Sequence, residues 1–178
     1  MLELKEIEKI TDVLHLHECL KKESDRGCAL MAAAFLDVWL EELLRKLFVP
    51  DKGTTDTMVG VNGPLGTYSA RIDAAYLLGT YGNLTRQDLH LIRKVRNDFA
   101  HDPKELSFRD EPMAGRCRAL NLSRHEPKAS PRRRFCDAVL ALAATIHIAT
   151  DESERPDSVA ERVLTINERK TWRKQKLK

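Results

Sequence analysis

The sequence predicts an all-α fold, namely a single-domain helical bundle of about five to seven helices followed by a basic C-terminal tail. Only 8 glycines and 7 prolines interrupt the 178 residues, and the dominance of Leu, Ala, Glu, Lys and Arg favours helices over strands. Apolar residues recur every three or four positions, and no segment alternates as a half-buried strand does. A chain of this length with 42% hydrophobic residues buries one substantial core. We therefore predict a helical domain over 1–150 and a tail over 151–178.

The first two helices are the longest in the N-terminal half. The first is predicted over about 2–22, where apolar residues are three or four positions apart. Ser24 or Asp25 caps the second, which runs to about Phe48. This second helix is apolar on most of its circumference, so we expect it in the centre of the bundle.

The later elements are delimited by Gly, Pro and capping residues. In chain order they are a polar Gly- and Thr-rich loop over Pro50–Gly63, a helix-entry turn at 63–67, a third helix ending near Gly79, a fourth from about Thr85 to His101 that Pro103 helps to stop, short helical or irregular pieces over 104–130, and a long fifth helix over Pro131–Thr150.

The fourth helix carries an arginine on its apolar stripe. On a helical wheel, Arg96 falls among the apolar residues Leu89, Leu91, Ile92, Val95 and Phe99. A guanidinium on a core-facing stripe keeps its charge, so it requires a carboxylate, a set of hydrogen bonds or access to a cleft.

Two carboxylates on the second helix are candidates for that partner. Asp37 lies within the leucine arc of the helix, and Glu41 follows one turn later at its margin. An arginine and a carboxylate that both lie on apolar stripes can satisfy each other's charge by forming an ion pair. We predict a structural ion pair between Arg96 and either Asp37 or Glu41.

The formal net charge of +3 is concentrated at the C-terminal end. From Arg162 onward there are seven Lys or Arg and one Glu, so this segment carries +6 and the preceding chain −3. The body therefore lacks the basic footprint that is usual in nucleic-acid-binding domains. In the tail, the candidate nucleic-acid contacts are Arg169, Lys170, Trp172, Arg173 and Lys174. A solvated, partly disordered or helical end accounts for the same charges.

Several function classes receive no support from the sequence. It has no CxxC pair, zinc knuckle, HExxH motif or Ser-His-Asp spacing, so we expect no metal and no other cofactor. The charged start and the four unpaired cysteines indicate a reduced, cytoplasmic protein. The longest apolar runs are shorter than the roughly 20 residues of a membrane span. No membrane partner is expected.

Three segments carry a resemblance to a known family. The blocks 22–37, 63–73 and 89–101 resemble signature blocks of the bacterial mannitol operon repressor and its paralogues, over roughly residues 5 to 150. The resemblance implies an all-helical cytoplasmic protein that lowers transcription of a mannitol uptake and utilisation operon, and it brings no catalytic residues. The sequence shows no helix-turn-helix pair with a basic recognition helix. A protein partner in transcription regulation and operator DNA are both open as targets.

A second, more distant resemblance concerns the hexapeptide 96–101. Arg96, Asn97 and His101 are similar to the Arg-x4–6-His motif of HEPN domains, helical bundles that often dimerise and, in active members, cleave RNA without metal. That resemblance implies a proton-transfer role for His101, phosphorane stabilisation by Arg96 and an orienting role for Asn97. It also implies a homodimer. The structural alternative is a core arginine and a histidine that stabilises a helix end.

Overall fold

The computed structural model describes residues 4–103, 105–123 and 128–157, and within this part of the chain it contains seven α-helices and no strand. In chain order they are α1 (Leu4–Lys22), α2 (Asp25–Leu47), α3 (Lys52–Val59), α4 (Tyr68–Leu77), α5 (Asn83–His101), α6 (Met113–Arg118) and α7 (Pro131–Glu152). The predicted all-α class is thereby confirmed.

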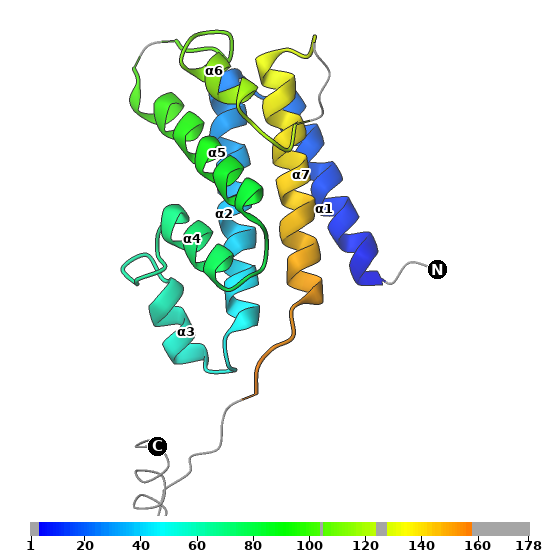
Figure 1. The fold of residues 1–178 in the computed structure, drawn as a ribbon, viewed down its shortest axis with the longest axis vertical. Coiled ribbons are helices and arrows are strands. Elements are labelled where there is room, and N and C mark those ends of the chain that lie inside the picture. The colour runs from blue at the N-terminus through cyan, green and yellow to red at the C-terminus, as the bar shows by residue number, and fades with distance from the viewer. Residues whose placement is uncertain (1–3, 104, 124–127, 158–178) are drawn as a thin grey trace, which may run out of the picture.

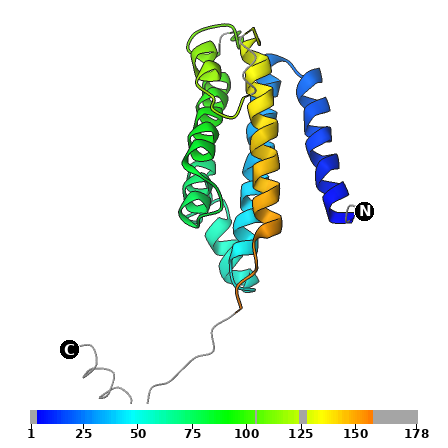
Figure 2. The same ribbon diagram turned by 45° about the vertical axis from the view of Figure 1, so that its right-hand side comes forward.

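Helix α2 occupies the centre, as its apolar circumference predicts. It contacts α1, α3, α4, α5 and α7. Figure 2 shows α1 on one side of α2 and α7, and α4 and α5 on the other. The short helices α3 and α6 lie near opposite ends of the bundle (Figure 1). Two of the segments that carry the family resemblance, in α4 and α5, therefore lie side by side against the third, in α2.

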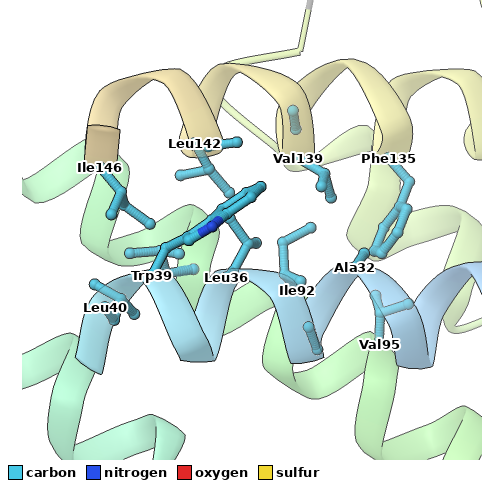
Figure 3. Packing of buried hydrophobic residues seen from close by; sticks show 14 of the residues in the cluster. Ala32, Leu36, Trp39, Leu40, Ile92, Val95, Phe135, Val139, Leu142 and Ile146 are labelled. Carbon is cyan, nitrogen blue, oxygen red and sulfur yellow. The ribbon is translucent and has the colours of Figure 1, made fainter. Parts of the chain in front are cut away.

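The core forms where α2, α5 and α7 meet. Figure 3 shows side chains from all three helices interdigitating around Leu36 and Trp39. The labelled apolar residues are Ala32, Leu36, Trp39, Leu40, Ile92, Val95, Phe135, Val139, Leu142 and Ile146, and each is buried. On α5, four of the five residues predicted on the apolar stripe are buried, while Leu91 is half-buried. Burial of this apolar stripe holds α5 against the bundle.

Helix α3 lies where the sequence predicts a polar loop, so that prediction is wrong. Asp51 caps the helix, because its Oδ1 accepts from Thr54 N over 3.0 Å. Thr55 and Val59 are buried on its inner side. The cap and this packing outweigh the low helix propensity of Gly and Thr, as tertiary contacts often do.

Asp88 of α5 fixes the segment that follows α6. Its fully buried carboxylate accepts hydrogen bonds from Asn121 N, Asn121 Nδ2 and Leu122 N, at 2.9, 2.8 and 2.7 Å. Three N–H donors satisfy a carboxylate that burial would otherwise penalise. The irregular stretch around 121 and 122 therefore has a defined place on α5.

Candidate functional site

The junction of α2, α3 and α4 is organised around Arg71 of α4, of which 7% is exposed. Its Nη1 donates to Asp37 Oδ1 over 2.8 Å, and its Nη2 lies 2.6 Å from Glu41 Oε2. The same guanidinium donates to Leu65 O and Val59 O over 3.0 and 2.9 Å. Two carboxylates and two carbonyls thus satisfy one buried cation. Arg71 ties α4 and the turn before it to the central helix.

The predicted ion pair of Arg96 with Asp37 or Glu41 is therefore wrong. Both carboxylates bind Arg71, whereas Arg96 is exposed and its Nη1 donates to Asn97 Oδ1 over 2.9 Å. A helical wheel takes no account of whether a neighbouring helix covers a given turn. Helix α4 has 10 residues and α5 has 19. The shorter α4 does not cover the whole length of α5, and Arg96 reaches solvent.

The helix-entry turn at 63–67 is confirmed, and close backbone packing explains its glycines. A Cβ on Gly63 would lie 2.2 Å from Thr57 O, and one on Gly66 would lie 2.3 Å from Gly60 O. The N–H groups of both glycines, and that of Leu65, donate to carbonyls of the same region. Since these amides are already used, the turn has none of them left to cradle a phosphate.

The three residues of the HEPN-like motif lie in the second half of α5. Arg96 and His101 are exposed and Asn97 is half-buried. His101 is the last residue of the helix. Among the described residues no hydrogen bond joins Arg96 to His101. The structure places Asn97 against Arg96, and it leaves the two proposed catalytic groups separate on one helix.

A charged cluster that the sequence did not reveal connects α4 to the start of α5. Asp73 Oδ1 accepts from Arg86 Nε over 2.7 Å and lies 3.1 Å from His90 Nε2. The hydrogen bond from Arg86 holds the pKa of the Asp73 carboxyl below its usual range. The Arg86 guanidinium also lies 5.1 Å from the centre of the Tyr76 ring. Asp73 lies in the segment 63–73 and His90 in the segment 89–101, which both carry the family resemblance. This shared membership is the one feature of the sequence that could have pointed to the cluster.

The turn between α4 and α5 exposes three leucines beside this cluster. Leu77, Leu78 and Leu84 are 81%, 53% and 54% exposed. Gly79 has a φ of +77°, a conformation that favours glycine at the end of a helix. We name Leu77, Leu78 and Leu84 the leucine turn. An exposed apolar patch is typical of a contact surface for another protein.

One further set of predicted site residues falls outside what the structure describes. The candidate nucleic-acid residues Arg169, Lys170, Trp172, Arg173 and Lys174 lie outside the described residues. Within the described ranges, no three His, Cys, Asp or Glu side chains are grouped so that they could hold a metal ion. No described helix has both the length and the apolar character that a membrane span requires.

Taken together, the described residues define an all-helical bundle protein with an exposed apolar turn beside a charged cluster. The chain belongs to the mannitol repressor family, because the family model MtlR, described as "Mannitol repressor", matches residues 12–148. This match confirms the family that the three sequence blocks resemble.

A solved structure with the same fold is that of the MtlR–HPr complex from Escherichia coli. The TM-score is 0.64 at 20% sequence identity, and the match covers 76% of this chain and 98% of that chain. None of the curated proteins that were compared with the chain matches it.

Proposed function

We propose that this protein represses a mannitol uptake and utilisation operon by binding a protein partner, and that the partner is an HPr protein. Membership of the mannitol repressor family supports the operon. A structure of similar fold was solved as a complex with HPr, which supports the kind of partner. The observation in this chain that carries the proposal is the leucine turn, because exposed leucines beside a charged cluster provide apolar contact area and specificity together.

The charge distribution of the body favours a protein partner over operator DNA. The chain before Arg162 carries a net charge of −3. Several of its arginines are already paired with acidic residues of the same body: Arg86 with Asp73, Arg116 with Asp98, Arg118 with Glu111 and Arg132 with Asp25. Paired arginines have less charge available for phosphates, on which affinity for DNA largely depends. Any affinity of the chain for DNA then rests on the basic tail.

Titration calorimetry with purified HPr from the same organism tests the proposal. We expect the full chain to bind HPr, and the double variant Leu77→Asp/Leu84→Asp to lose at least about tenfold in affinity, since truncated or charged contact residues at an interface centre cost more than about 1 kcal/mol. Leu14→Asp is the matched control. Leu14 is 59% exposed and belongs to α1, a helix that lies on the other side of α2 and α7 from α4 and α5 (Figure 2). Equal loss in both variants, or no binding by the parent, contradicts the proposal.

A second candidate function is that of a metal-independent endoribonuclease, which requires Arg96 and His101 to be accessible, as they are. The observation that favours it is the hydrogen bond of 2.9 Å from Arg96 Nη1 to Asn97 Oδ1, which orients an accessible guanidinium. Incubation with labelled single-stranded RNA in EDTA distinguishes the two functions. Cleavage by the parent that is absent in His101→Ala supports the nuclease. We expect no cleavage by either protein.

A further inference from the structure

Two cysteines from different helices lie in contact inside the bundle. Cys28 is in the second turn of α2 and is fully buried, whereas Cys136 of α7 is partly exposed. Their Sγ atoms are 3.8 Å apart, and both are free thiols. The bond of a disulfide is about 2.05 Å long. A displacement of less than 2 Å, shared between the two side chains, would therefore bring the sulfurs to bonding distance.

A surface pocket gives small solutes access to Cys136. The pocket has a volume of about 240 Å³, and its lining includes Lys21, Arg132, Arg133 and Cys136. Arg132 and Arg133 at its wall favour a thiolate over a thiol at this position, and Asp137 in the same wall opposes it. Cys28 is covered by Cys136 and the surrounding core, so a reagent in the pocket meets Cys136 first.

The environments of the two thiols differ in a way that assigns them different roles. The hydrogen bond from Cys28 and the nearby Arg132 guanidinium lower the pKa of Cys136. The same hydrogen bond, together with burial, raises the pKa of Cys28. Arg132 is held in place by Asp25 Oδ1 and by Leu20 O, to which its Nη2 donates over 2.9 Å. The accessible sulfur is thus the better nucleophile, and the buried one lies within hydrogen-bond distance of it.

We propose that Cys136 and Cys28 form an oxidation site for hydroperoxides, in which Cys136 reacts first and Cys28 completes a disulfide between α7 and α2. In the first step the Cys136 thiolate attacks one peroxide oxygen. The S–O bond forms and the O–O bond breaks. The leaving group is hydroxide for hydrogen peroxide or an alkoxide for an organic hydroperoxide, and it takes a proton to become water or the alcohol. In the second step the Cys28 sulfur attacks Cys136, the S–S bond forms, and the sulfenic hydroxyl leaves with the Cys28 proton as water. The two thiols lose two electrons and the peroxide gains them.

The disulfide would act on a network that joins three parts of the bundle. Asp25 lies three positions before Cys28, pairs with Arg132 and accepts from Phe108 N over 2.9 Å. The neighbouring Arg26 donates to Asp102 O over 2.9 Å, at the end of α5. These contacts link the start of α2, where the thiol pair lies, to the segment that follows α5. This inference does not rest on the proposed partner or operon.

Mass spectrometry of the reduced full chain after treatment with hydrogen peroxide tests the proposal. We expect the mass to fall by about 2 Da through loss of two hydrogens, a Cys28–Cys136 linked peptide after digestion, and reversal by dithiothreitol. The Cys28→Ala variant should stop at a sulfenic acid on Cys136, which dimedone traps. Alanine suits the buried site, and a melting curve verifies that this variant folds.

Two other cysteines serve as controls. Burial raises the pKa of Cys117 to about 12, so Cys117→Ala should oxidise like the parent. Cys19→Ser should also oxidise like the parent. A 2 Da loss that persists in Cys136→Ser overturns the proposal. So does a parent in which Cys136 proceeds to sulfinic acid without a linked peptide, or in which neither Cys28 nor Cys136 reacts.

Discussion

Arg71 Nη1 donates to Asp37 Oδ1 over 2.8 Å and thereby joins α4 to the central helix α2. Glu41, one turn further along α2, completes the pair of carboxylates around the same guanidinium. The ion cluster binds together two of the three segments that carry the family resemblance. Its first role is architectural, because it places α4, and with it the leucine turn, relative to the rest of the bundle.

Replacement of Arg71 should destabilise the protein far more than replacement of Arg96. Arg71→Met leaves Asp37 and Glu41 without their cation, and breaking a buried pair costs about 3–5 kcal/mol. Because the two carboxylates are 32% and 28% exposed, we expect a smaller loss, about 2–3 kcal/mol. Urea denaturation of both variants measures the difference. Arg96→Met, the matched control at an exposed site, should stay within about 0.5 kcal/mol of the parent. Equal losses would contradict the assignment of the cluster.

The sequence predicts most of the helices but not the partner of Asp37, for a physical reason. Helical periodicity placed α1, α2, α4, α5 and α7, because each must bury one apolar stripe. The same periodicity places Arg71 on a stripe with Tyr68, Ile72 and Ala75, so it offers two stripe arginines for Asp37. Which of them reaches the carboxylate depends on the relative lengths of α4 and α5 and on how the two helices pack, and a single helical wheel contains neither.

The leucine turn and the thiol pair could not be predicted from the sequence, because both depend on how the helices pack. Leu77 and Leu78 end a helix whose residues Ile72 and Ala75 are buried, and only the packed structure shows that nothing described covers the two leucines. Cys28 and Cys136 are 108 positions apart. Their contact follows from the packing of α2 against α7, which no local pattern encodes.

Two tyrosines whose hydroxyls are buried should respond oppositely to removal of the hydroxyl. Tyr81 Oη donates to Ile72 O over 2.9 Å, so Tyr81→Phe should lose about 1 kcal/mol of stability. Tyr68 Oη is buried, and nothing in the described part of the chain hydrogen-bonds to it. Tyr68→Phe should therefore be neutral or stabilising, by up to about 1 kcal/mol. Thermal melting of both variants at pH 7 measures this difference. A destabilised Tyr68→Phe would mean that the hydroxyl has a partner.

The same tyrosines predict a loss of stability in alkali. Burial raises the pKa of Tyr68 and of Tyr81 above the ordinary value. A group whose pKa is higher in the folded state contributes its stability below the unfolded pKa, which is about 10 for tyrosine, and loses it as the pH rises further. Denaturation curves between pH 8 and 11, which bracket that value of about 10, should show a smaller alkaline loss in Tyr81→Phe than in the parent. Parallel pH profiles would contradict this cause.

Removal of the Asp88 carboxylate should release the segment after α6. Asp88→Ala leaves the N–H groups of Asn121 and Leu122 without their acceptor, and the expected cost is about 3 kcal/mol. Hydrogen exchange should show faster exchange at both amides. The control is Asp110→Ala. This exposed carboxylate accepts from Ser107 N over 2.8 Å, and its loss should cost less than about 1 kcal/mol. Unchanged exchange at Asn121 and Leu122 would contradict the role of Asp88.

We propose that the body represses through a protein contact at the leucine turn. A mannitol-operon reporter tests this in a strain that lacks the chromosomal copy and is complemented with the parent, Leu77→Asp/Leu84→Asp, Leu14→Asp or a chain that ends at Asp157. We predict that the parent, Leu14→Asp and the shortened chain repress the reporter, whereas the leucine-turn variant, present at the same level, does not. Full repression by the leucine-turn variant, together with loss of repression in the shortened chain, would contradict the account and assign the function to the basic tail.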